Sequence, residues 1–348
     1  MSPYIVIVLL FSLGLGTTLT FASSHWLLAW MGLEINTLAI IPIMARRHHP
    51  RAIEATVKYF LVQATAAAML LFSSVTNAWM LGQWEISHLS HPLACTIAVM
   101  ALALKVGLAP AHFWLPEVLQ GITLTAGLAL STWQKLAPLA LILQVAENAH
   151  PDLLMALAIC STLVGGWGGL NQTQLRKILA YSSVAHLGWM ILVTQLAPQM
   201  TLLALITYII LTAAAFLTLH KMDATHTITL ASTWTKSPAL SALACLILLS
   251  LGGLPPLTGF LPKWLILQEV ATQGLALTAV VVALTALLSL YFYLRLAYVM
   301  AMVLTPHPAS SSSAWRSLTK RPTLLLATVV VLAVCLLPLA PSILTLLK

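Results

Sequence analysis

The sequence has few charged residues. Of its 348 residues, 16 are Lys or Arg and 8 are Asp or Glu, so charged residues make up 7%, whereas a soluble domain carries about 25%. Hydrophobic residues make up 60%. The chain has too little polar side-chain surface to coat a water-soluble particle, which excludes a soluble enzyme, a nucleic-acid-binding protein and a disordered protein. We predict an all-α polytopic membrane protein.

Paired cysteines and catalytic motifs are also absent. Cys95, Cys160, Cys245 and Cys335 lie far apart, each inside an apolar run, so we interpret them as small core residues and not as a disulfide framework or a zinc or iron–sulfur site. The sequence contains no Walker loop, dinucleotide fingerprint or haem ligand set. We therefore expect no cofactor and no metal in this chain, and no redox or hydrolytic chemistry by this chain alone.

The start of the chain lacks a targeting pattern. Met1-Ser-Pro-Tyr4 leads directly into the apolar stretch Ile5–Leu10, with no basic region and no Arg-rich presequence. This pattern predicts either that the first helix is its own insertion signal or that the chain is made beside its membrane.

Apolar runs fill most of the sequence. A membrane-spanning helix needs about 20 mostly apolar residues, and the runs predict about eleven such helices in a single transmembrane domain, 1–348. They are expected at 3–22, 26–44, 56–80, 93–120, 122–145, 150–171, 175–196, 199–220, 237–270, 274–303 and 323–346. The fourth and ninth are overlong and interrupted by Gly and Pro. The connector Pro306–Pro322, with Ser310–Ser313, predicts a flexible surface loop.

Basic residues gather in alternate loops. Eleven lie on the N-terminal side and only Lys348 on the other side, which predicts an N-terminus in the cytoplasm, or in the matrix if the organelle is a mitochondrion. The eleven are Arg46, Arg47, Arg51, Lys58, Arg176, Lys177, Lys221, Lys236, Arg316, Lys320 and Arg321.

One motif occurs twice. Gly107–Pro116 and Gly253–Pro262 share the pattern G-L-x-P-x-x-x-[WF]-L-P at an offset of 146 residues, within the fourth and ninth spans. The copies lie five spans apart in the order of the chain, an odd number, so the second copy is expected to be inverted across the membrane. We predict two inverted five-helix repeats, at about 3–145 and 150–303, and a terminal helix at about 323–346. Broken helices in inverted repeats line transport pathways; the alternative is a chance match between two Pro-rich stretches.

A few charges fall inside the predicted spans. They are Lys105, Lys135, Lys263 and Arg295, and Glu34 is the only acid in the middle of a span. Arg295 lies near the basic end of its helix, where its guanidinium can reach the interface. A charge at the bilayer centre costs roughly 2.5–3.5 kcal/mol, so the three lysines and the glutamate need partners or water.

Prolines supply polar groups near the lysines. Pro110 has no N–H to donate to the carbonyl of Val106, so we expect a bare backbone acceptor beside Lys105. Lys135 precedes Pro138 in the same way.

These charged side chains are suited to binding and releasing protons. At ~4 Å and an effective dielectric constant of ~20, Glu34 and Lys105 would attract each other by about 4 kcal/mol, enough to decide whether a buried lysine holds its proton. Lys135 and Lys263 would pass on the change by like-charge repulsion. His186, four residues after a serine on the same helical face, is a further candidate proton carrier. The alternative is a static ion pair with two water-solvated lysines.

Five motifs together suggest a family. They are Met31–Asn36 (MGLEIN), Leu104–Glu117, Thr132–Pro138, Arg176–Gly188 and Gly252–Lys263. Over essentially the whole chain they resemble the subunit 2 family of NADH–ubiquinone oxidoreductase (complex I), in its mitochondrially encoded vertebrate form, among the antiporter-like proton-pumping subunits.

The resemblance implies a proton-translocating membrane-arm subunit of the mitochondrial inner membrane, with the N-terminus in the matrix and the C-terminus in the intermembrane space. It implies that redox chemistry in other subunits, which hold FMN, iron–sulfur clusters and ubiquinone, drives translocation. Partners would be neighbouring antiporter-like and small membrane-arm subunits and membrane lipids, with no nucleic acid. Glu34 and Lys105 would be the coupled pair, Lys135 the connecting lysine, Lys263 the terminal proton site, and His186 would lie on the same hydrated path.

Two other functions are weighed against this one. A freestanding sodium/proton antiporter is disfavoured because sodium prefers anionic oxygen ligands, and Glu34 is the only carboxylate in the middle of a span. A purely structural membrane-arm subunit is disfavoured because it would have no use for four costly intramembrane charges.

Overall fold

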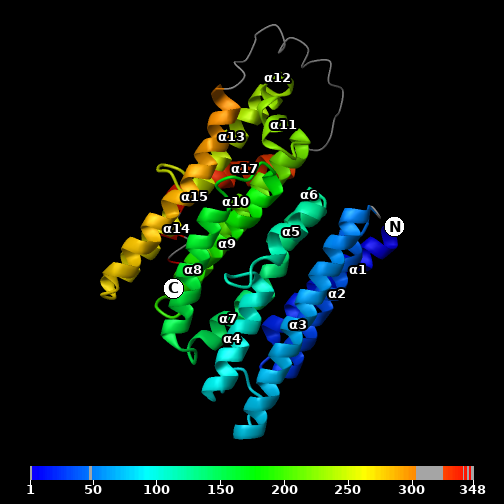
Figure 1. Ribbon diagram of the computed structural model, residues 1–348, viewed down its shortest axis with the longest axis vertical. Helices are drawn as coiled ribbons and strands as arrows, with labels where there is room; N and C mark the ends of the chain where they lie inside the picture. Colours follow the sequence, from blue (N-terminus) through cyan, green and yellow to red (C-terminus); the bar gives the residue numbers. More distant parts are fainter. Residues whose placement is uncertain (1, 47–48, 303–323, 340, 343–344, 346–348) are drawn as a thin grey trace. The chain divides into compact units, whose positions relative to one another are not determined.

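The computed structural model describes residues 2–46, 49–302, 324–339, 341–342 and 345, and this part of the chain is helical (Figure 1). The only extended pairing within it is two isolated bridges, His25 with Glu85 and Gln174 with His226. The prediction of an all-α protein is confirmed. The helices are α1 (Pro3–Ala22), α2 (Trp26–Met44), α3 (Pro50–Leu81), α4 (Pro92–Val106), α5 (Trp114–Gly121), α6 (Leu124–Ser131), α7 (Trp133–Ala146), α8 (Pro151–Gly168), α9 (Leu175–Val193), α10 (Pro198–Met222), α11 (Thr227–Ala231), α12 (Thr233–Lys236), α13 (Pro238–Gly252), α14 (Phe260–Thr272), α15 (Ala276–Met302), α17 (Leu324–Cys335) and η2 (Leu337–Leu339).

The helices follow the predicted spans. Seven segments are long and apolar enough to cross a membrane: α1, α2, α3, α6 with α7, α8, α10 and α15. Three shorter apolar helices, α4, α13 and α17, together with α9 occupy the remaining predicted positions. The third helix begins at residue 50 and not at 56, because Pro50 fits the first turn and the His49 side chain accepts a hydrogen bond from the Arg51 N–H.

Several predictions fall on residues outside the described part. The predicted loop Pro306–Pro322 is one of them, and so are five of the basic residues used to predict orientation, Arg47, Arg316, Lys320, Arg321 and Lys348.

The chain forms two compact units, Met1–Ser161 and Thr162–Lys348. In the first unit, α2 packs against α1 and α3, and α4 packs against α3 and α7 (Figure 1). In the second, α10 packs against α9, α13, α14 and α17. The first unit contains the predicted first repeat, 3–145; the inversion of one repeat relative to the other stays a prediction.

Both predicted helix breaks are present, and they have the same backbone conformation. Gly107 ends α4 with a φ of 90°, and Gly253 ends α13 with a φ of 84°, a left-handed conformation that favours glycine. The peptide bonds Ala109–Pro110 and Pro255–Pro256 are both cis. Each pair is related by the 146-residue offset, so the repeated motif corresponds to a repeated structure.

A third interruption was not predicted. The fifth span is divided at Thr132 into α6 and α7. The Thr132 hydroxyl donates to the Leu128 carbonyl at 2.7 Å, and Pro138 has no N–H for the carbonyl of Gln134. Hydroxyl-to-backbone bonding of this kind competes with regular helix geometry.

The cysteine prediction is only partly right. Cys95 is buried and Cys245 half-buried, but Cys160 and Cys335 are exposed on the surface of the chain. In a membrane protein an apolar side chain is equally at home in the core and against lipid, so an apolar run does not determine which side is buried.

Two glycines bring α1 and α2 together. A Cβ atom added at Gly16 would overlap the amide oxygen of Asn36 and lie 2.8 Å from the carbonyl oxygen of Gly32, and one added at Gly32 would lie 2.6 Å from a methyl carbon of Thr20. Small residues at such positions let helix backbones approach closely in a membrane.

We expect Gly16→Ala to separate the two helices and lower stability by about 1–3 kcal/mol, as overpacking does elsewhere. Gly14→Ala is the matched control, because a Cβ at Gly14 meets nothing within 4 Å. Thermal unfolding of the purified protein in detergent or lipid measures the difference. Equal stability of the two variants would contradict the close-packing interpretation.

Candidate functional site

The first unit brings Glu34 and Lys105 together as predicted. The Lys105 Nζ atom, at the end of α4, lies 3.8 Å from Oε1 of Glu34 on α2, and the Lys105 side chain is 1% exposed. The single hydrogen of the Thr37 hydroxyl is shared between the Glu34 backbone carbonyl at 2.9 Å and the other Glu34 carboxylate oxygen at 3.2 Å. At this separation and an effective dielectric constant of ~20, the attraction is about 4 kcal/mol.

The carbonyls at the end of α4 are satisfied by neutral side chains. Gln63 donates to the Lys105 carbonyl at 3.3 Å, and the Trp114 indole donates to the Leu104 carbonyl at 3.0 Å. Within the described chain, the Lys105 Nζ atom makes no hydrogen bond. The expected contact between this ammonium and a bare carbonyl is therefore not formed, and the ion pair with Glu34 is what holds the charge.

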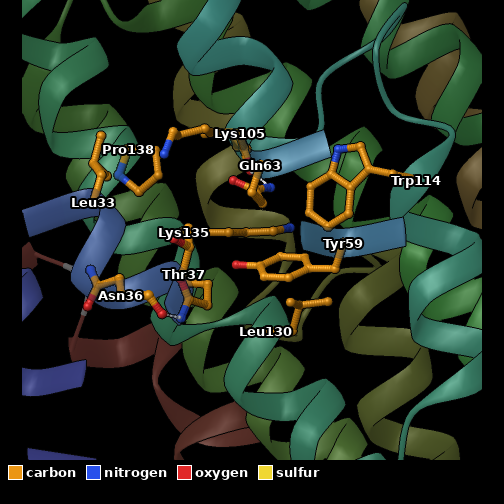
Figure 2. A pocket seen from close by; sticks show the side chains of 12 residues that line it. Leu33, Asn36, Thr37, Tyr59, Gln63, Lys105, Trp114, Leu130, Lys135 and Pro138 are labelled. Carbon is orange, nitrogen blue, oxygen red and sulfur yellow. Dashed lines mark hydrogen bonds between the residues drawn. The ribbon is translucent and has the colours of Figure 1, made fainter. Parts of the chain in front are cut away.

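Lys105 and Lys135 line one small cavity. Its volume is about 10 Å³, room for about one water molecule, and Figure 2 shows side chains from several helices directed into it. Lys135, on α7, is 2% exposed. The lining residues are Leu33, Asn36, Thr37, Tyr59, Gln63, Lys105, Val106, Trp114, Leu130, Gln134, Lys135 and Pro138.

The Asn36 amide is a buried polar group beside this cavity. Both its nitrogen and its oxygen are buried without a hydrogen-bond partner among the described residues, and a buried unpaired polar group costs about 1–3 kcal/mol. Sequence reasoning missed Tyr59 and Gln63; their i, i+4 spacing as polar residues in an apolar helix was the available signal.

The second unit brings Lys263 and His186 to one cavity. This cavity has a volume of about 20 Å³ and is also lined by Tyr208. Lys263 Nζ donates to the Gly252 carbonyl, the last of α13, at 2.7 Å, where the helix end carries a partial negative charge. A Cβ at Gly253 would lie 2.9 Å from this ammonium, so a glycine is needed there for the lysine to approach.

The hydrogen bond of His186 identifies its protonated nitrogen. Nδ1 lies 2.7 Å from the carbonyl oxygen of Ser182, and a carbonyl only accepts, so Nδ1 carries the hydrogen. In the neutral ring, Nε2 is then an acceptor and can receive a proton.

The two breaks carry different charges. The 146-residue offset places Glu117 at the position of Lys263, and Glu117 forms an exposed ion pair with Lys58 at 2.8 Å. Exposed pairs contribute little to stability, because water and salt screen them. The repeated backbone is therefore used in two ways, with a half-buried lysine after the second break and a surface carboxylate after the first.

Broken membrane helices are typical of membrane transporters, and in this chain a lysine lies beside each break. A sequence profile described as NADH:quinone oxidoreductase/Mrp antiporter, TM matches residues 23–289, and one described as NADH dehydrogenase subunit 2 C-terminus matches residues 290–344. NADH-ubiquinone oxidoreductase chain 2 of Salmo salar is 66% identical over 347 residues, 100% of this chain and 99% of that one. The chain belongs to the NADH-ubiquinone oxidoreductase chain 2 family, which confirms the resemblance.

Two solved structures resemble this chain. A chain of respiratory complex I from Thermus thermophilus is 31% identical with a TM-score of 0.80, covering 97% of this chain and 80% of that one. A chain of the Mrp complex from Dietzia sp. DQ12-45-1b is 18% identical with a TM-score of 0.75, covering 86% of this chain and 61% of that one, and shows a shared fold.

Proposed function

We propose that this chain is a proton-translocating membrane-arm subunit of NADH–ubiquinone oxidoreductase. The observation that carries the proposal is the buried Glu34–Lys105 ion pair beside a cavity shared with Lys135. Lys263 and His186 form the second proton site, in the other unit.

Separation of the ion pair is the step that moves a proton. While Glu34 lies beside it, Lys105 keeps its proton, because the attraction of about 4 kcal/mol offsets part of the desolvation of the ammonium. When the two separate, Lys105 gives its proton to water in the cavity. A neutral Lys135 accepts this proton through that water, and the positive charge that it then carries opposes the return of a proton to Lys105.

The electron-transfer groups belong to other subunits in this proposal. FMN, iron–sulfur clusters and ubiquinone lie outside this chain, which responds to their chemistry. Its partners are neighbouring antiporter-like and small membrane-arm subunits and membrane lipids. In this proposal the chain lies in the mitochondrial inner membrane, with the N-terminus in the matrix and the C-terminus in the intermembrane space. The distribution of the basic residues and the vertebrate relatives support this placement.

Gentle detergent extraction tests the assembly. We expect the chain to migrate only in a particle far larger than its own 37.4 kDa and to copurify with NADH-oxidising activity. A stable monomer that exchanges sodium for protons would favour the antiporter instead.

We expect Lys135→Met in the intact complex to lower the number of protons pumped per NADH oxidised, since the side chain keeps its length but no longer carries a proton. Proton uptake by vesicles containing the complex, measured together with NADH consumption, gives the ratio. Lys58→Gln, which removes an exposed charge, is the control and should leave the ratio unchanged. An unchanged ratio for Lys135→Met would leave a structural role as the better account of that lysine.

A further inference from the structure

Four hydroxyl groups that the proposed function does not use lie buried in the second unit. Ser182 and Ser183 belong to α9, Tyr208 to α10 and Tyr293 to α15, and each is at most 1% exposed. Helix α9 packs against both α10 and α15, so the four groups meet within one helix cluster.

These hydroxyls are close neighbours. The Tyr208 hydroxyl lies within hydrogen-bonding reach of Ser183 and close to Tyr293, and Tyr293 faces Ser182. Both serines donate to backbone carbonyls one turn earlier, at 2.8 and 2.7 Å, which leaves their oxygens as acceptors toward the tyrosines. The Tyr293 hydroxyl has no direct hydrogen bond within the described part of the chain. A buried hydroxyl of this kind requires a water, which would bridge it to Ser182.

One end of this cluster reaches the proton site of the second unit. The rings of Tyr208 and His186 lie 5.7 Å apart between centroids, and both residues line the cavity that holds Lys263.

The other end of the hydroxyl cluster lies toward the helix ends that carry the basic residues. Arg295, two residues after Tyr293, is exposed and donates to the Leu170 carbonyl in the turn before α9. Arg176, at the start of α9, is six residues before Ser182, roughly 9 Å along the helix axis. The hydroxyls therefore fill part of the distance between the basic surface and the buried lysine.

We propose that Tyr208 and Tyr293 form a hydroxyl relay that carries protons from the basic end of the second unit to His186 and Lys263. The Tyr293 oxygen accepts a proton from the basic end as its own proton leaves, through water, to the Tyr208 oxygen, and the Tyr208 proton leaves in turn to Nε2 of His186. At each tyrosine oxygen one O–H bond forms as another breaks, so both residues stay neutral. This inference rests on the proposed function and assigns the direction from which its second site is loaded.

The test uses Tyr208→Phe, Tyr293→Phe and the double variant in the intact complex in lipid vesicles, with protons pumped per NADH oxidised as the readout. Phenylalanine keeps the ring and removes only the hydroxyl. Loss of a positioned proton-transfer group slows transfer by roughly 10²-fold or more, so the double variant should lower the ratio as far as Lys263→Met does. Adding Lys263→Met to it should lower the ratio no further.

Tyr291→Phe, on the same helix but 59% exposed, is the matched control and should pump normally. Ser183→Ala removes the acceptor of Tyr208 with little change in volume and should reproduce part of the loss, which keeps the proposal testable where a tyrosine variant fails to assemble. Normal ratios for the tyrosine and serine variants, with a lowered ratio for Lys263→Met, would overturn the relay and leave the proposed function standing. A normal ratio for Lys263→Met as well would count against the proposed function itself.

Discussion

The double variant Glu34→Gln/Lys105→Met is expected to fold and assemble nearly as well as the wild type and to lose the proton pumping of this subunit. Breaking a fully buried ion pair by removing one partner costs about 3–5 kcal/mol, whereas replacing both partners with neutral side chains is often close to neutral. Lys105→Met alone leaves the Glu34 carboxylate without its cation, and the cost is lower here because 24% of that side chain is exposed. Stability should therefore fall in the single variant and recover in the double variant.

Pumping should not recover with stability. A neutral Gln–Met pair cannot hold or release a proton, so the ratio of protons pumped to NADH oxidised stays low in both single variants and in the double variant. Thermal unfolding of the purified complex gives the stability, and vesicle acidification gives the ratio. Thr37→Val removes a hydrogen bond to Glu34 but no charge. Its stability and its ratio of protons pumped to NADH oxidised should therefore lie between those of the wild type and the charge-removing variants. Recovery of full pumping in the double variant would show that the pair is only structural.

The sequence predicted the helices well because the membrane requires long apolar segments and internally satisfied backbones. The breaks at Gly107 and Gly253 were also predictable, because Gly and Pro within an overlong span mark where a helix stops. The break at Thr132 was missed because a threonine that bonds to the carbonyl four residues earlier gives no clear signal: Thr132 does so at the break, but Thr212 and Thr218 do so within the intact helix α10.

The charged residues of the site were predictable, because a charge in lipid costs free energy. Glu34, Lys105, Lys135 and Lys263 were identified as exceptions to an apolar background. Their surroundings were not predictable, because neutral polar groups such as the Asn36 amide and the Tyr208 hydroxyl give no such signal. Which lysine bonds to a helix-end carbonyl also depends on backbone geometry, and this contact is made by Lys263 and not by Lys105.

Lys263→Arg is expected to preserve the fold of the second break and to stop proton transfer there. The guanidinium keeps a positive charge and N–H donors for the Gly252 carbonyl, which Lys263 now reaches at 2.7 Å. Arginine does not lose its proton in proteins, so the site keeps its positive charge but cannot release and rebind a proton. Lys263→Met, in contrast, leaves that carbonyl unpaired at a cost of about 1–3 kcal/mol.

The two substitutions therefore separate the two roles of this lysine. If Lys263 carries protons, both variants pump fewer protons per NADH, while only Lys263→Met lowers the unfolding temperature. If it serves only to cap α13, Lys263→Arg pumps normally and Lys263→Met is merely less stable. Lys58→Arg, at an exposed ion pair, controls for the exchange of an ammonium for a guanidinium. Normal pumping by Lys263→Arg would remove Lys263 from the proton path, because no group with a permanently bound proton can pass one on.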